Sequence, residues 1–238
     1  MPAWMGRITR TLGLVALVVA AAPQAPAQES GSRHLAPGFT SRPAASRLVV
    51  IPADMELFSI SAGGVVEPRA DWTEAGQKNF AAALAAQRER LGANTAELPQ
   101  ADAEELSDVA ALHRAVADAI AMHHRGGIKL PTKHGKLDWS LGEAVRPLKE
   151  KTGANYALFT WVRDSYASTE RKAAMLAMAL VGALSLGGEQ VGYASLVDLN
   201  TGRVVWFNEI DRWWGDLREP ASARETADAL LKDFPPLK

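Results

Sequence analysis

The stretch LVDLNTGRVVWFN, residues 196–208, decides the fold class of this chain. An apolar strand runs into Asp198, residues 200–202 carry Asn, Thr and Gly, and a second apolar strand reaches Trp206. Asparagine and glycine are typical of tight turns, and glycine has no Cβ to oppose a positive φ. We therefore predict a β-hairpin that turns at these three residues, with Gly202 at positive φ.

Such a hairpin is also typical of a β-propeller, a fold that repeats its blade about every 40 to 50 residues. The pattern Asp-x-x-Thr-Gly-x-x-x-Trp occurs once in this chain, and the long stretch before it is largely helical in pattern. The hairpin is therefore expected to join two core strands of another fold, and a β-propeller is excluded.

Strand patterns occur early and late in the chain. A β-branched run at residues 47–52 predicts a buried strand, and Gly63-Gly64 predicts a tight hairpin within residues 55–68. Tyr, Phe, Trp and Val follow one another closely at residues 155–162, which favours a further strand. The hairpin of the first paragraph supplies the last two strands, predicted at 190–199 and 202–210.

Helix patterns fill the middle of the chain and follow the last hairpin. One helix is predicted at residues 103–124, and three others are predicted to begin in capping boxes, in which an N-cap side chain pairs with a Glu three residues later. These boxes are Asp71 with Glu74, Ser140 with Glu143, and Ser222 with Glu225. Pro147 is expected to interrupt the third helix. The order of elements predicts a mixed α/β fold, a layered sheet with helices packed on it, in a single domain at residues 46–238.

The N-terminus has the pattern of a cleavable secretory signal. Arg7 and Arg10 precede an apolar run at residues 12–22, and Ala25-Pro26-Ala27 supplies small residues for signal peptidase. Eleven apolar residues span only about 17 Å as a helix, whereas a membrane core is about 30 Å thick. We expect a signal peptide at residues 1–27 and a mature periplasmic chain that begins near Gln28.

Composition narrows the class of protein further. Residues 28–45 are polar and rich in Gly, Ser and Pro, which predicts a flexible lead-in. Without Arg7 and Arg10, 24 basic residues face 27 acidic ones, 24 − 27 = −3, so no nucleic-acid partner is expected. The chain has no cysteine, so neither a disulfide nor a lipid anchor on the mature N-terminus is expected.

Two motifs carry a resemblance to known proteins: Gly-Ala-x-Tyr-Ala-Leu at residues 153–158 and Asp-Leu-x-Thr-Gly-x-Val-x-Trp at residues 198–206. With the order of elements from residue 47 to residue 234, they resemble a group of uncharacterised bacterial envelope proteins. The α/β domain of that group is similar to the periplasmic domain of the curli secretion-channel family and to the N-terminal domain of the Tol-system propeller protein. The resemblance implies a non-catalytic domain that acts in envelope assembly or complex formation.

The chain departs from the channel family in two respects. It lacks the acylated N-terminal cysteine, and residues 173–184 are apolar without the alternation that a transmembrane barrel strand needs. A secretion pore is therefore not expected.

Catalytic chemistry is the alternative interpretation. His134 and Asp138 flank a glycine in a loop, and with Arg163 they would form the site of a small periplasmic hydrolase. No Gly-x-Ser-x-Gly elbow or cysteine nucleophile accompanies them. The structural interpretation of residues 163–168 is an Arg163–Asp164 ion pair followed by a serine helix cap. No cofactor or metal motif is present, so neither is expected.

The run AAMLAMALVGAL, residues 173–184, is apolar on every side of a helix and too short to span a bilayer. It would form an interface for self-association or for another envelope protein, an internal helix, or, over residues 173–186, a peripheral membrane contact. It would also suit a carrier of an apolar ligand, with the run lining the pocket. The Trp213–Trp214 pair would cover the core or anchor an interface. The candidate interface residues are Met175, Met178, Leu180, Leu184, Trp213 and Trp214.

Overall fold

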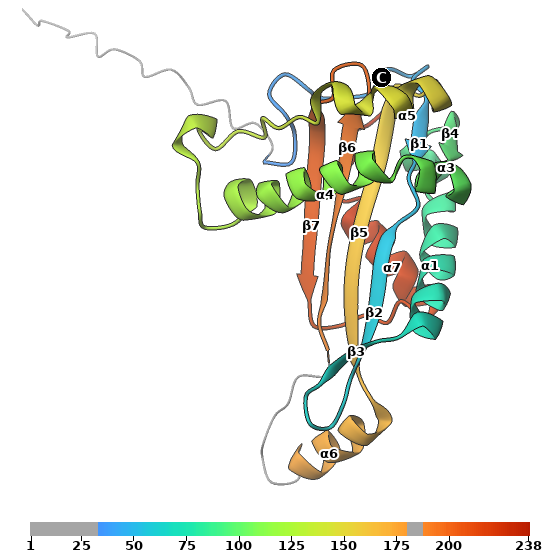
Figure 1. Ribbon diagram of the computed structural model, residues 1–238, viewed down its shortest axis with the longest axis vertical. Helices are drawn as coiled ribbons and strands as arrows, with labels where there is room; N and C mark the ends of the chain where they lie inside the picture. The colour runs from blue at the N-terminus through green and yellow to red at the C-terminus, as the bar shows by residue number, and fades with distance from the viewer. Residues whose placement is uncertain (1–32, 180–187) are drawn as a thin grey trace, which may run out of the picture. The chain divides into compact units, whose positions relative to one another are not determined.

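The computed structural model describes residues 33–179 and 188–238, which all belong to one compact unit. In this unit a seven-stranded sheet lies between two layers of helices (Figure 1). The predicted mixed α/β fold is confirmed. In chain order the elements are β1 (Leu48–Val50), β2 (Asp54–Ile60), β3 (Val66–Pro68), α1 (Ala70–Ala85), α2 (Arg88–Leu91), β4 (Thr95–Glu97), α3 (Gln100–Glu105), α4 (Ser107–Ile120), η1 (Ala121–Arg125), η2 (Pro131–Lys133), η3 (Gly142–Val145), α5 (Arg146–Thr152), β5 (Tyr156–Ala167), α6 (Thr169–Ala179), β6 (Gln190–Asp198), β7 (Val204–Arg212) and α7 (Pro220–Leu230).

Strand β5 is the centre of the sheet. On one side it pairs antiparallel with β6, and β7 lies outside β6. On its other side, β1 pairs parallel with the first part of β5 and β2 pairs parallel with the second part. Pro52 lies between β1 and β2, where its missing N–H interrupts the ladder. Strand β4 lies outside β1 and β3 lies outside β2.

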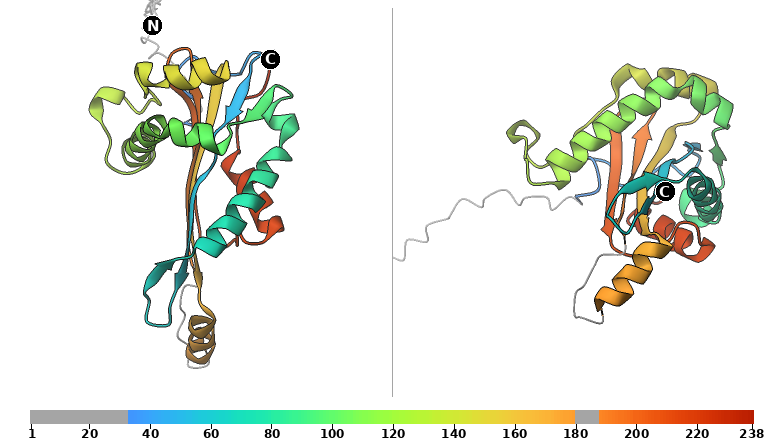
Figure 2. Two further views of the ribbon diagram at one scale, coloured as in Figure 1. Left: turned by 45° about the vertical axis from the view of Figure 1, so that its right-hand side comes forward. Right: turned by 60° about the horizontal axis from the view of Figure 1, so that its bottom comes forward.

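The side chains of β5 alternate between two apolar cores, one on each face of the sheet. Leu158 and Val162 pack toward α1 and α7, whereas Ala157 and Phe159 pack toward α4 and α5. The two helix layers are seen on opposite sides of the sheet in Figure 2. Because both faces are covered, residues 156–160 of the central strand are buried without interruption.

The hairpin predicted at residues 196–208 is confirmed. Strands β6 and β7 pair antiparallel, and Gly202 has φ +71° as predicted. The Asp198 carboxylate holds the turn, since it accepts hydrogen bonds from the Asn200 N–H (2.9 Å) and from Thr201 Oγ1 (3.0 Å). The Gly202 carbonyl accepts a hydrogen bond from the Leu141 N–H at 2.8 Å, which ties the turn to the segment before η3. The hairpin predicted around Gly63-Gly64 is also present, as β2 and β3.

The predicted capping boxes are wrong at Asp71 and Ser222, whereas Ser140 Oγ accepts a hydrogen bond from the Gly142 N–H at 2.9 Å, at the start of η3. Helix α1 begins at Ala70, so Asp71 lies in its first turn and pairs with Arg69 instead of capping. Helix α7 begins at Pro220, because proline fits the first turn of a helix, and Ser222 is therefore already helical. The predicted helix at 103–124 is broken near Leu106 into α3 and α4 and ends in the π-helical η1.

The segment predicted as a lead-in packs on the domain from residue 33 onward. Arg42 is 1 % exposed, and its guanidinium donates to the carbonyls of Pro235 (3.3 Å) and Arg90 (3.0 Å). Its backbone N–H donates to the Pro236 carbonyl at 2.8 Å. The buried guanidinium also lies over the Phe234 ring, 4.8 Å from its centroid. Composition alone did not predict these contacts, because each of them joins residues far apart in the sequence.

Candidate functional site

The last residues of strands β2, β5 and β7 lie at the same end of the sheet, which we call the carboxyl end. Ile60, the last residue of β2, pairs with Ala167, the last of β5. Gln190, the first residue of β6, pairs with Arg212, the last of β7, and also with Asp164 of β5. Ligand sites of open α/β sheets form at such edges, because the connections that follow the strands meet there.

Large apolar side chains are exposed on three connections at the carboxyl end. Trp213 and Trp214 follow β7 and are 57 % and 65 % exposed, and Leu176 of α6 is 70 % exposed. Val65 and Val66 are exposed at the turn into β3. These five, which we call the apolar end, make up most of the eight large apolar residues exposed in the described part of the chain. Exposed apolar residues gathered in one region mark interaction sites.

A buried polar cluster lies beneath the two tryptophans. Asp164 Oδ2 accepts hydrogen bonds from the Tyr166 hydroxyl and from Gln190 Nε2. Gln190 Oε1 in turn accepts from Arg212 Nε at 2.7 Å and from Thr226 Oγ1 at 3.0 Å. The five side chains come from β5, β6, β7 and α7, so the cluster joins three strands and a helix at the carboxyl end.

The cluster also holds the connector that carries the tryptophans. The Leu217 N–H donates to the Tyr166 hydroxyl at 2.6 Å. Arg218 forms an ion pair with Asp216, and its guanidinium lies over the Tyr166 ring, 4.4 Å from the centroid. The apolar residues after β7 are therefore presented from a fixed connector, which reduces the entropy lost on binding.

Burial changes the ionisation of this cluster. It raises the pKa of Asp164 to about 7, although the hydrogen bonds from Tyr166 and Gln190 act in the opposite direction. Burial also raises the pKa of the Tyr166 hydroxyl and lowers that of Arg212. A hollow of about 160 Å³ lies beside Asp164 and is lined in part by Lys172, Trp213 and Trp214.

A carboxyl group with a pKa near 7 is a candidate acid or base, and it is a common mark of functional sites. Asp164 is only 2 % exposed, however, and one of its oxygens already accepts two hydrogen bonds from the cluster. We therefore interpret the cluster as the support of the apolar end. Sequence reasoning missed it, although Asp164 and Tyr166 are two residues apart on a strand and must share a face.

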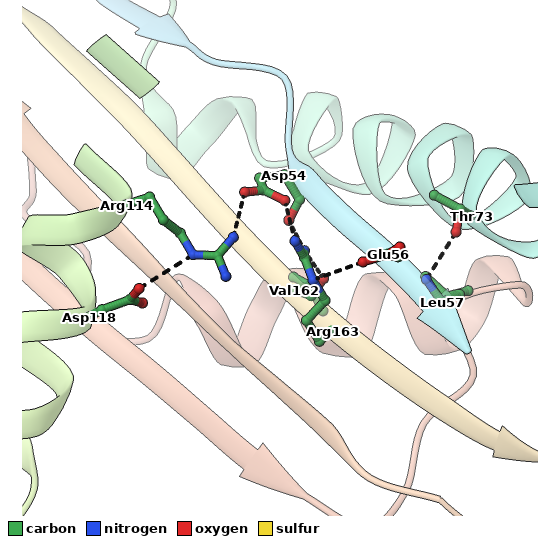
Figure 3. A network of polar contacts seen from close by, with 8 residues as sticks. All are labelled: Asp54, Glu56, Leu57, Thr73, Arg114, Asp118, Val162 and Arg163. Atoms are coloured by element: carbon green, nitrogen blue, oxygen red, sulfur yellow. Dashed lines mark hydrogen bonds and ion pairs between the residues drawn. The ribbon is translucent and has the colours of Figure 1, made fainter. Parts of the chain in front are cut away.

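Arg163, proposed from the sequence as a hydrolase residue, lies in an ion-pair network on the opposite face of β5 (Figure 3). Its guanidinium contacts Asp54 Oδ1 at 2.7 Å and Glu56 Oε2 at 3.6 Å. Arg114 of α4 binds the other oxygen of Asp54 at 2.9 Å, so Asp54 joins the two arginines. Both guanidinium groups also lie over the Trp161 ring, 4.7 and 4.9 Å from its centroid.

The predicted Arg163–Asp164 pair is wrong, because successive side chains of a strand point to opposite faces. Arg163 binds Asp54 on the α4 side, whereas Asp164 binds Tyr166 and Gln190 on the α7 side. The predicted serine cap is confirmed, since Ser168 Oγ accepts a hydrogen bond from the Arg171 N–H at 3.1 Å.

His134 and Asp138 lie in the loop between η1 and η3. His134 is exposed at φ +50°, and Asp138 lies 3.9 Å from the Lys133 ammonium. Within the described residues, no hydrogen bond or ion pair joins His134, Asp138 and Arg163 to one another. Asp138 and Arg163 therefore make separate contacts, and the three side chains do not form the general-base arrangement that the hydrolase interpretation needs.

Some of the predicted interface residues lie in the described part of the chain and others lie outside it. Met175 is half-buried and Leu176 is exposed in α6, which lies beyond the end of β5 (Figure 1). The Met178 side chain, Leu180 and Leu184 lie outside the described residues. Trp213 and Trp214 are part of the apolar end.

A second hollow, of about 480 Å³, lies between α1 and the α3–α4 segment. Leu84, Leu98, Val109 and Phe159 line it, and none of its lining residues comes from the described part of 173–186. The apolar-ligand carrier that the sequence suggested would therefore use a different part of the chain from the one predicted.

His113 of α4 and His124 of η1 are buried, whereas His123 of η1 is half-buried. His113 is 4 % exposed, its Nε2 lies 2.5 Å from Ser195 Oγ, and burial lowers its pKa to about 3. His124 is also buried, and its Nε2 lies 2.8 Å from the Arg33 carbonyl. Over residues 33–179 and 188–238, no three His, Asp or Glu side chains are grouped closely enough to hold a metal ion. No helix in these ranges is long and apolar enough to cross a membrane.

The fold and the site thus define a mixed α/β domain with an exposed apolar end. No family model matches the sequence, and no curated protein matches it. Among solved structures, the chain is similar to the PelC dodecamer from Paraburkholderia phytofirmans, with 14% identity and a TM-score of 0.40 over 84% of this chain and 96% of that one.

Two further solved structures are similar to the chain. The lipoprotein GNA1162 from Neisseria meningitidis has 15% identity and a TM-score of 0.29, over 70% of this chain and 79% of its own. The LpoB C-terminal domain from Salmonella enterica has 11% identity and a TM-score of 0.29, over 74% and 87%. Likenesses at these scores say nothing of what this chain binds or does.

Proposed function

We propose that the protein is a non-catalytic binding and assembly protein of the bacterial cell envelope, and that it self-associates through the apolar end. The observation that carries the proposal is the gathering of Val65, Val66, Leu176, Trp213 and Trp214 on three connections at one edge of the sheet. Tryptophan is enriched among the residues that dominate binding energy at interfaces.

Two further features support binding rather than catalysis. The polar groups beneath the tryptophans bond to one another and to the connector, so they serve the presentation of the apolar end. Of the residues that a hydrolase would use, Asp138 pairs with Lys133 and Arg163 pairs with Asp54, and neither pair includes His134. A surface of this kind gains free energy from apolar burial and requires no reacting group.

Placement in the envelope rests on the N-terminal sequence. Arg7, Arg10, the apolar run at 12–22 and the small residues at 25–27 form the pattern of a cleavable leader. We expect the chain recovered from the periplasm to begin at or near Gln28, and N-terminal sequencing checks this. A chain recovered from the cytoplasm with Met1 intact would contradict the placement.

Self-association is tested by sedimentation of the mature chain at micromolar concentration. The variant Trp213→Ser/Trp214→Ser should associate more weakly by a factor on the order of a hundred or more, because interface hot spots contribute about 2 kcal/mol or more each. Leu176→Ser should weaken association further, since this side chain is the most exposed of the five.

The matched control for these variants is Met122→Ser/Ile128→Ser, which removes two side chains of comparable exposure outside the apolar end. The control should associate as the unchanged protein does. A mature chain that is monomeric at these concentrations, or a control that weakens association equally, would overturn the self-association proposal.

A further inference from the structure

Residues 119–137 have a charge pattern unlike that of the rest of the chain. They contain four cations, Arg125, Lys129, Lys133 and Lys136, three histidines and no Asp or Glu, in a chain whose net charge is −1. We call residues 121–138 the basic lobe. The lobe comprises η1, η2 and the loops beside them, and it extends past the β7 edge of the sheet (Figure 1).

The lobe is attached to the domain at defined points. Arg125 forms an ion pair with Glu209 of β7 at 3.0 Å, and Leu137 is buried in the core on the α4 side of the sheet. The His123 ring stacks on Trp139 with an interplanar angle of 7°. Figure 2 shows that the lobe lies well away from α6, one of the three connections that carry the apolar end.

The cations of the lobe outnumber the carboxylates that contact them. Arg33, the first described residue, lies beside the lobe, because its carbonyl faces His124 Nε2 at 2.8 Å. With Arg33 the lobe has five cations, and among the residues that the structure describes the carboxylates that contact them are Glu209 and Asp138, so 5 − 2 = +3. The Lys129 ammonium donates to the His124 carbonyl at 2.7 Å, which fixes its position but leaves its charge uncompensated.

Two large apolar side chains are exposed among these cations. Met122 is 52 % exposed and Ile128 is 63 % exposed. Two contributions together hold a protein on a membrane surface. Apolar side chains enter the boundary of the bilayer, and the cations around them attract the anionic headgroups. From this juxtaposition we infer that the basic lobe binds the surface of an anionic phospholipid membrane.

A lipid surface fits this lobe better than nucleic acid or an acidic protein. Single-stranded nucleic acids are bound by phosphate contacts and by stacking on aromatic side chains, and the lobe contains no Phe, Tyr or Trp. The lobe contributes no residue to the hollows beside Asp164 or between α1 and α4, so no shaped receptor for a protein segment is formed by it there. A membrane needs no matching shape. This surface is also distinct from residues 173–186, for which the sequence suggested a membrane contact.

The test uses the mature chain with vesicles of phosphatidylcholine alone and with phosphatidylglycerol added, followed by sedimentation of the vesicles. Binding should require phosphatidylglycerol and should weaken as salt is raised. Lys129→Gln/Lys136→Gln should lower the partition coefficient by about 25-fold, because each cation near an anionic surface contributes about fivefold. Met122→Ser/Ile128→Ser should also lower it, which a purely ionic contact would not do.

The matched control is Lys78→Gln/Lys232→Gln, which removes two exposed lysines outside the lobe. The control should bind as the unchanged chain does, and circular dichroism should show all variants folded. Equal loss in the control, binding to phosphatidylcholine alone, or no vesicle binding would overturn the inference. If inorganic phosphate displaces the chain from the vesicles, or if Met122→Ser/Ile128→Ser binds them normally, the lobe is a site for free anions and the membrane inference is wrong. Lysine-dependent binding of a DNA oligonucleotide without vesicle binding would assign it to nucleic acid.

The lobe and the apolar end are separate surfaces. The vesicle experiment therefore tests the lobe without depending on self-association, and the sedimentation experiment tests self-association without lipid.

Discussion

Gly202→Ala is expected to destabilise the domain by about 3 kcal/mol. Gly202 has φ +71°. Holding a residue with a Cβ in this region lowers the free energy of unfolding by about 1–2 kcal/mol. A Cβ at this position would also lie 2.2 Å from the Gly142 carbonyl oxygen and 2.7 Å from the Gly142 nitrogen. These are backbone atoms that cannot rotate away, and relieving such a contact adds about 1–3 kcal/mol. The midpoint of thermal unfolding should fall by about 10 °C for a domain of this size.

Gly135→Ala is the control that separates the two causes. Gly135 has φ +70°, almost the same as Gly202, but a Cβ there would meet no atom within 4 Å. Gly135→Ala should therefore lower the free energy of unfolding only by the cost of the positive φ, about 1 kcal/mol. Equal losses of stability in the two variants would contradict the close approach of the β6–β7 turn to Gly142, the first residue of η3.

The second large effect is a pair of opposed pH dependences. Asp164 has its pKa raised from 3.8 to about 7, so the folded chain holds this proton more tightly than the unfolded chain does. Its contribution to stability is complete below pH 4 and is lost as the pH rises to 7. His113 has its pKa lowered from 6.5 to about 3, so its contribution is complete above pH 6.5 and is lost as the pH falls.

Between pH 4 and pH 6.5 these two groups act in opposite directions, and each changes the free energy of unfolding by about 3 kcal/mol. Asp164→Asn keeps an oxygen that can accept from Tyr166 and Gln190 but removes the titration. This variant should therefore become more stable as the pH rises through that range, by about 3 kcal/mol relative to the unchanged protein. Urea unfolding at several pH values measures the difference.

His113→Gln is the complementary variant and should show the opposite trend, with stability falling as the pH rises. His124, whose pKa burial also lowers, acts in the same direction as His113 and is present in both variants. Parallel stability curves for the unchanged protein and both variants would contradict the assignment of the two shifts.

The sequence predicted both tight turns correctly, although it misplaced the starts of two helices. The signal for the turn at Gly202 lies within residues 198–202, and the signal for the Gly63-Gly64 turn is equally local, and both hairpins were confirmed. Pairing between distant segments was not predictable in the same way. Nothing near Pro52 indicates that β1 and β2 would share one side of β5, because β5 lies about a hundred residues further along the chain.

The candidate site shows the same division. Trp213 and Trp214 were proposed from composition, since two adjacent indoles stand out in any sequence. Asp164, Gln190 and Arg212 were missed as a cluster because they meet only through the β5–β6 and β6–β7 registers. The charge pattern of the basic lobe can be read from the sequence. The position of the lobe beyond β7 could not be predicted from it.

The interruption at Pro52 also has a kinetic consequence. Strands β6 and β7 are joined by the five residues 199–203, whereas the pairing of Val50 with Leu158 closes a loop of 158 − 50 = 108 residues. The entropy lost on closing a loop grows with its length, and folding slows as contacts become more distant in sequence. Because both early strands pair with β5, neither can gain this partner by a local step. We therefore expect β1 and β2 to join the sheet only after β5 has formed, and to do so by pairing with it.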